Sequence, residues 1–252
     1  MQRLAVIAGA WLGLAGAVQP GSRAVPAREQ QSWTVALPAG RVLSARVAVG
    51  SIRLQGEARA DALIEVIRSA PSKDGLSRIP VAVDERDAEV RLTALQPENG
   101  TEPAYRAEVT LRVPREATLG PMSLMEGALT LTSFAGHVDA RVRRGTIEAT
   151  NVQGSVRLET EIGNITASGM RLMPDGLLRL RTFNGDVRLA LAERPRDARI
   201  LALALNGTIN SELPLTIKDS WGPRWGEATL GSGEPVISID VVNGHIWITS
   251  PR

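Results

Sequence analysis

The 252-residue sequence contains no cysteine, so disulfide bonds contribute nothing to its stability. Aromatic residues make up only 3% of it, and 29 Lys and Arg residues are spread along the chain against 27 Asp and Glu residues. A surface that binds nucleic acid usually combines a basic stripe with stacking aromatic side chains. The composition therefore indicates a mixed, solvated surface, and we expect no nucleic acid partner.

Catalytic and cofactor-binding motifs are also missing. The sequence has no Gly-x-Ser-x-Gly elbow, no phosphate-binding loop and no dinucleotide fingerprint. Its two histidines, His137 and His245, each directly follow a glycine, and their spacing does not bring them together as metal ligands. We therefore predict no metal, no cofactor and no enzymatic activity.

The N-terminal residues have the pattern of a secretory signal. Arg3 precedes an apolar run from Leu4 to Val18, and small residues follow up to Ala27. The run is shorter than the roughly 20 apolar residues that a membrane span needs, so a retained N-terminal anchor is the less favoured alternative. We expect residues 1–27 to be a signal peptide and the mature chain, without a transmembrane anchor, to be periplasmic or extracellular.

Short phrases that begin with glycine recur along the chain. In the central run, Gly127, Gly136, Gly145, Gly154 and Gly163 lie nine residues apart, and the same phrase begins at Gly50, Gly185, Gly207 and Gly244. Leu, Val or Ile stands two residues after each central glycine, Ala or Leu stands four residues after, and mostly polar residues lie between. Alternation with period two predicts a strand with one solvated face. The glycines fit turns that need a positive φ.

Two all-β architectures fit a nine-residue period. In an antiparallel meander sandwich, Asp139 and Glu148 would lie on neighbouring strands as a like-charge pair. In a solenoid with two strands per coil, Asp139 lies beside Arg157 and Glu148 beside Thr166. We therefore predict a β-solenoid-like stack of short strands with an irregular β N-terminal portion, and the meander sandwich is the alternative.

The same pattern predicts one domain over residues 32–250. Residues 32–115 have longer, less regular strands, and residues 116–250 hold the regular strand repeats and a C-terminal cap, which a stacked repeat needs at its end. The 22-residue intervals from Gly163 to Gly185 and from Gly185 to Gly207 suit a solenoid coil with a longer turn. No linker rich in Pro or Gly divides the two portions.

The repeated strands, the segment AEVTLRVP and the segment LPLTIKDSWGPRWGEATLGSGEPVISIDVVNGHIWI resemble the bacterial family of putative adhesins known as DUF4097. The resemblance covers roughly residues 32–250, and its C-terminal segment is the more specific part. It implies an exported β-strand repeat protein of the cell envelope. It supplies no catalytic residues.

The loop SWGPRWGE holds the candidate binding residues Trp221, Arg224 and Trp225. In a structural interpretation, the two indoles cover an end or a side of the solenoid, together with Trp247. In a functional interpretation, they form a stacking platform for sugar rings beside a cation. We favour the cap.

The sequence thus predicts an exported, non-enzymatic adhesin or envelope scaffold that binds a cell-wall glycan or an envelope protein. Self-association through the solenoid ends or edge strands is a further expectation. The alternative is a polysaccharide lyase or glycoside hydrolase on a β-helix, which needs carboxylates that converge in one groove. The outward acids instead alternate with arginines, which indicates a salt-bridged face; they are Asp139, Glu148, Glu159 and Asp186, with Arg157 and Arg188 between them.

Overall fold

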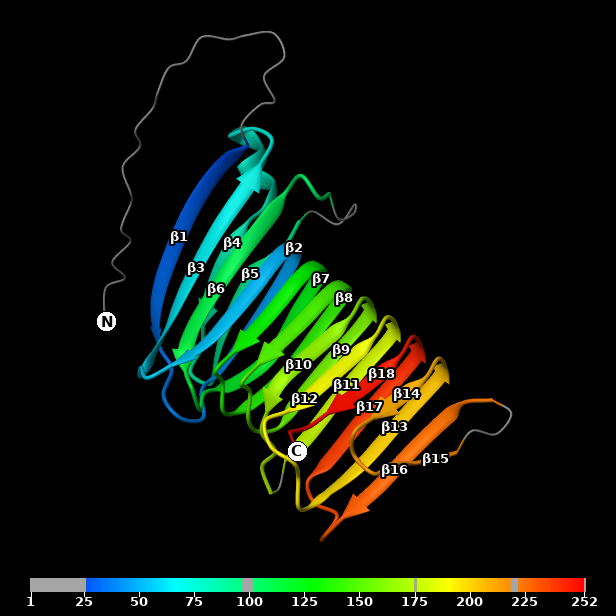
Figure 1. The fold of residues 1–252 in the computed structure, drawn as a ribbon. Helices are drawn as coiled ribbons and strands as arrows, with labels where there is room; N and C mark the ends of the chain where they lie inside the picture. The colour runs from blue at the N-terminus through cyan, green and yellow to red at the C-terminus, as the bar shows by residue number, and fades with distance from the viewer. Residues whose placement is uncertain (1–25, 97–101, 175, 219–221, 252) are drawn as a thin grey trace.

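The computed structural model describes residues 26–96, 102–174, 176–218 and 222–251 (Figure 1). These residues form eighteen strands and one 3₁₀ helix, η1 (Asp74–Arg78). The strands are β1 (Ala27–Ala36), β2 (Val42–Glu57), β3 (Asp61–Ala70), β4 (Val81–Glu85), β5 (Glu89–Ala94), β6 (Arg106–Pro114), β7 (Thr118–Thr132), β8 (His137–Thr150), β9 (Val156–Ile162), β10 (Ile165–Met170), β11 (Leu177–Asn184), β12 (Val187–Leu191), β13 (Ala198–Asn206), β14 (Ile209–Ser211), β15 (Thr216–Lys218), β16 (Arg224–Leu230), β17 (Val236–Asn243) and β18 (Ile246–Thr249). The prediction of an all-β chain is confirmed.

The strands form two facing sheets that meet at a corner. The long strands β2, β7 and β8 run through the corner, so that the first half of each belongs to sheet 1 and the second half to sheet 2. Sheet 1 has the order β4-β5-β2-β7-β8-β9-β11-β17-β13-β16-β15. Sheet 2 has the order β1-β3-β6-β2-β7-β8-β10-β12-β18-β14. Each pair of strands around the corner is one rung of the stack seen in Figure 1.

Parallel pairing in the central part confirms the predicted solenoid and excludes the meander. Asp139 pairs with Arg157, and Glu148 pairs with Thr166, as the charge pattern predicts. The antiparallel pairs lie at the two ends of the stack, where β1, β3 and β4 join at one end and β15 and β16 at the other.

The corner is a column of glycines, with one glycine on each rung. Its spatial order is Gly50, Gly127, Gly145, Gly163, Gly185, Gly244 and Gly207. At Gly145, where φ is +141°, an added Cβ would lie 1.7 Å from the carbonyl oxygen of Gly127 on the preceding rung. Gly136 and Gly154 stack in the same way at a second corner, where a Cβ on Gly154 would lie 2.2 Å from the carbonyl oxygen of Gly136. Glycines nine residues apart therefore lie at two different corners of one coil, and glycines eighteen residues apart stack on each other.

The last coil does not lie at the end of the stack. Strands β17 and β18 insert between β11–β12 and β13–β14, so Gly244 separates Gly185 from Gly207. The equal 22-residue intervals therefore do not describe successive rungs at this end. The insertion pairs β17 and β18 on both edges, and the antiparallel strands β16 and β15 cover the edge of β13 instead.

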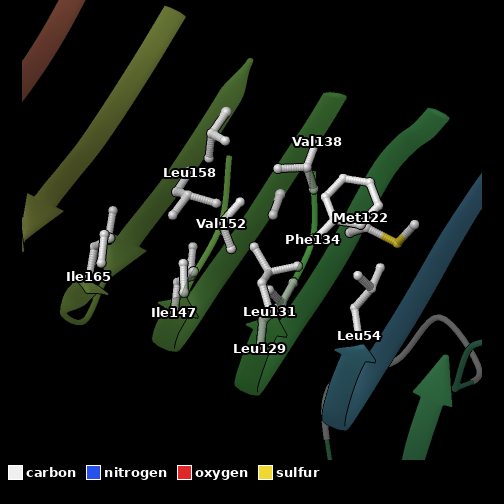
Figure 2. Close-up of a cluster of buried hydrophobic side chains, with 14 of the residues drawn as sticks. Leu54, Met122, Leu129, Leu131, Phe134, Val138, Ile147, Val152, Leu158 and Ile165 are labelled. Atoms are coloured by element: carbon white, nitrogen blue, oxygen red, sulfur yellow. The ribbon is translucent and has the colours of Figure 1, made fainter. Parts of the chain in front are cut away.

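Val, Ile, Leu and Ala fill the narrow space between the sheets. Leu129, Ile147 and Ile165 occupy the same position on successive rungs and are fully buried. Phe134 and Val152, from the links between coils, close the third side of this core (Figure 2). The buried cluster extends from Val35 to Ile248, so one core connects the irregular and the regular portions.

Candidate functional site

A groove of about 730 Å³ crosses the outer surface of sheet 1 beside the glycine column. We call it the corner groove. It is lined by Ser123, Leu124 and Met125 of β7, Arg141, Val142 and Arg143 of β8, Glu159, Thr160, Glu161 and Ile162 of β9, and Arg181, Phe183 and Asn184 of β11. Because these strands are hydrogen-bonded to each other in fixed register, the groove has a rigid floor.

Large apolar side chains are exposed in this groove, where strand alternation calls for polar residues. Met125, Ile162 and Phe183 are 40%, 49% and 54% exposed. Met125 and Phe183 lie in one cross-strand row with Leu205, which is 42% exposed, and Ile162 stands in the neighbouring row, next to the corner. The described residues contain only two other large hydrophobic side chains this exposed. An apolar patch of this kind, bordered by charged residues, is typical of a binding surface.

The charged residues of the groove leave one cation in excess. The Nε atom of Arg141 lies 3.3 Å from Asp139 Oδ1 and 3.6 Å from Glu159 Oε2, and Arg143 Nε lies 3.3 Å from Glu161 Oε2. Arg181 is exposed and forms no ion pair with any residue of the described ranges. The groove therefore favours a ligand that combines an apolar part with a negative charge.

An asparagine ladder ends at the groove. Asn206 Nδ2 donates to Asn243 Oδ1 at 2.8 Å, and Asn243 Nδ2 donates to Asn184 Oδ1 at 2.7 Å. On the next rung the same position is Ile162, which cannot continue the ladder. The amide NH₂ of Asn184 thus has no acceptor among the described residues and lines the groove as a free donor.

Two of the three residues predicted from the tryptophan loop lie at the end of the stack, away from the corner groove. Trp221 falls outside the described residues. Arg224 donates a hydrogen bond to the carbonyl oxygen of Gly207, the last glycine of the column. Trp225 is half-buried opposite Leu203 and donates from Nε1 to Glu227 Oε2 at 3.3 Å, which together with nearby Lys218 lowers the pKa of Glu227. The hydrogen bond of Arg224 therefore fastens β16 to the end of the glycine column.

We did not predict the corner groove, although the sequence carries a signal for it. Ile162 and Phe183 each stand directly before a corner dipeptide, Gly163-Asn164 and Asn184-Gly185. Gly163 and Gly185 were interpreted only as turn glycines. A large apolar side chain next to an exposed turn is the feature that could have indicated the groove.

Several acidic residues of sheet 1 are held in ion pairs with arginine. Besides the pairs of Glu159 and Glu161, Arg179 Nη2 lies 3.6 Å from Asp240 Oδ2. Across the described part of the chain, no group of three or more His, Cys, Asp and Glu side chains is suited to hold a metal ion. The same part contains no helix with the length and apolarity that crossing a membrane requires.

Comparisons with known proteins support the fold. No family model matches the sequence, and no curated protein matches it. Among solved structures, a putative cell adhesion protein from Clostridium sporogenes is 15% identical with a TM-score of 0.51, covering 90% of this chain and 100% of that chain. A putative adhesin from Bacteroides fragilis is 13% identical with a TM-score of 0.43, covering 92% of this chain and 100% of that chain. The first likeness shows that this chain shares its fold with that putative cell adhesion protein.

Proposed function

We propose that this protein is an exported, non-enzymatic binding protein of the adhesin type, which holds an extended segment of an envelope protein in its corner groove. The observation that carries the proposal is the group of exposed apolar side chains on the rigid strands β7, β9 and β11, all of which line the corner groove. The secretory pattern of residues 1–27 and the resemblance to the adhesin family support export. The fold shared with the Clostridium sporogenes protein supports the adhesin type.

The dimensions of the groove suit a short stretch of extended chain. Neighbouring strands lie about 4.8 Å apart, so four rungs span about 14 Å. An extended peptide advances about 3.5 Å per residue, so about four residues fill that length. Their apolar side chains would cover Met125, Ile162 and Phe183, and a carboxylate would pair with Arg181.

A glycosidase is a poorer fit to the same groove. Such an enzyme needs one protonated carboxylic acid and a second carboxylate facing one bond of the substrate. Glu159 and Glu161 belong to one strand, and each faces an arginine. The arrangement therefore supports binding through side chains over bond cleavage.

A random peptide library displayed on phage tests this proposal against the mature chain. We expect enrichment of peptides that place large apolar residues next to Asp or Glu. Synthetic versions of the enriched peptides should bind about tenfold more weakly to Phe183→Ser and to Arg181→Ser than to the original chain. Each variant lacks one contact with the peptide, and tenfold weaker binding corresponds to about 1.4 kcal/mol of binding free energy. Arg53→Ser, an exposed position on sheet 2, is the matched control. Failure to enrich such peptides, or equal affinity for all variants, would refute the proposal.

A further inference from the structure

A second cluster of side chains lies on the outer surface of sheet 2, where β12, β18 and β14 meet (Figure 1). Trp247 of β18 is half-buried at its centre and pairs with Arg188 on one side and Asn210 on the other. These three strands fix the indole on a flat, hydrogen-bonded surface. The cluster is separated from the corner groove by the glycine column.

Only one face of the indole is occupied by Arg188. The guanidinium carbon of Arg188 lies 4.4 Å from the ring centroid of Trp247, a cation–π distance. On the other side of Trp247, the edge strand β14 places the short, exposed side chain of Asn210, and the imidazole of His245 lies beside the indole with its ring tilted by 57°. Because no strand of the described ranges pairs with the outer edge of β14, a ligand can approach Trp247 from this side.

The polar groups around the ring are neutral as a set. Arg188 Nη2 lies 3.6 Å from Asp186 Oδ2, and Asp186 Oδ1 accepts the backbone N–H of His245 at 3.0 Å. The cation over the indole thus has its own counter-ion. The cluster gives no charge preference to a ligand.

His245 is held in one tautomer by Thr208. Its Nδ1 accepts the backbone N–H of Thr208 at 3.2 Å and lies 2.8 Å from the Thr208 hydroxyl. In a neutral imidazole whose Nδ1 is an acceptor, Nε2 carries the proton and donates. The imidazole centroid lies 5.6 Å from that of Trp247, so this donor stands beside the ring.

We propose that Trp247 is the platform of a carbohydrate site that takes one neutral pyranose ring of a glycan. The C–H face of a β-linked gluco-configured sugar stacks on the open face of the indole. The sugar hydroxyls then accept from Nε2 of His245 and donate to Oδ1 of Asn210, whose Nδ2 donates to Thr208 Oγ1 at 3.3 Å. This site does not depend on the corner groove, because it lies on the other sheet.

Isothermal titration calorimetry of the mature chain with cellotetraose and with the tetramer of N-acetylglucosamine tests the proposal. We expect saturable binding of at least one of them, and about tenfold weaker binding to Trp247→Ala. Asn210→Tyr keeps the tryptophan and fills its open face, so it should weaken binding to a similar extent even if Trp247→Ala folds poorly. Phe183→Ser, in the corner groove, should bind as the original chain does.

Sedimentation with insoluble peptidoglycan separates the two sources of such a sugar. Binding of the soluble tetramer together with co-sedimentation assigns the site to cell-wall glycan, and binding of soluble sugar alone assigns it to free oligosaccharide. The proposal is overturned if neither tetrasaccharide binds at millimolar concentration. It is also overturned if Asn210→Tyr, folded as judged by circular dichroism, binds the sugar with unchanged affinity.

Discussion

Replacement of Gly145 by alanine tests whether the glycine column determines the fold. Gly145 has a φ of +141°, and a Cβ there would lie 1.7 Å from the carbonyl oxygen and 2.7 Å from the carbonyl carbon of Gly127. Both atoms belong to the backbone, so no side-chain movement relieves the contact. The two rungs would have to separate at the corner.

The expected loss of stability has two parts. A non-glycine residue in a sparsely populated backbone region costs about 1 to 3 kcal/mol. Separation of the rungs leaves at least one buried backbone hydrogen bond unmade, which costs about 1 to 3 kcal/mol more. The sum is about 4 kcal/mol, a large part of the roughly 5 to 15 kcal/mol that stabilises a typical domain.

Gly40 provides the matched control, because it has a φ of +87° and its Cβ would meet nothing within 4 Å. Gly40→Ala should therefore lower the unfolding free energy only through its unfavourable backbone conformation, by about 1 kcal/mol. Urea unfolding followed by circular dichroism should show the midpoint of Gly145→Ala lowered by roughly 1.5 to 2 M relative to the original chain. Equal midpoints for the two variants would show that close approach between rungs does not explain the column.

Two further substitutions test single contacts. Thr182 is fully buried and donates to the carbonyl oxygen of Gly163 at 3.0 Å, so Thr182→Val should lower the unfolding free energy by about 1 kcal/mol, whereas Thr146→Val at an exposed position should change it little. The hydrogen bond from Arg68 lowers the pKa of Glu29 below 4.5, so this pair stabilises the fold above that pH and is lost as the pH falls through the folded pKa. Glu29→Gln should therefore unfold more easily than the original chain at pH 7, and this difference in unfolding free energy should shrink as the pH falls below 4.5. A difference that stays equal at pH 7 and at acid pH would contradict the assignment.

The stacking of the central coils could be predicted because the relevant signals are local. Alternating apolar residues specify which side of each strand is buried, and the charges of Asp139 and Arg157 distinguish a solenoid from a meander. A positive φ was the only reason the sequence offered for the corner glycines. The close approach between rungs depends on which glycines become neighbours, and that is a property of the assembled stack.

The insertion of β17 and β18 could not be predicted from spacing. Gly207 and Gly244 begin similar phrases, and both the sequential and the inserted order bury the same alternating residues. What separates the two orders is the pairing of β13 with β16, which occupies the edge that a sequential last coil would need. The corner groove was missed for a related reason, since exposure of Phe183 depends on what the neighbouring rungs place beside it.

Ile162 separates a structural from a functional explanation of the corner groove. It occupies the ladder position that Asn184, Asn243 and Asn206 hold on later rungs, and its side chain is 49% exposed. An asparagine at position 162 would accept a hydrogen bond from the free NH₂ of Asn184. It would extend the ladder by one hydrogen bond, which contributes about 1 kcal/mol to the free energy of unfolding. If binding accounts for the isoleucine, Ile162→Asn should keep or raise the unfolding free energy and weaken the selected peptides. If Ile162 instead contributes to packing, the variant will be less stable and will bind those peptides as before.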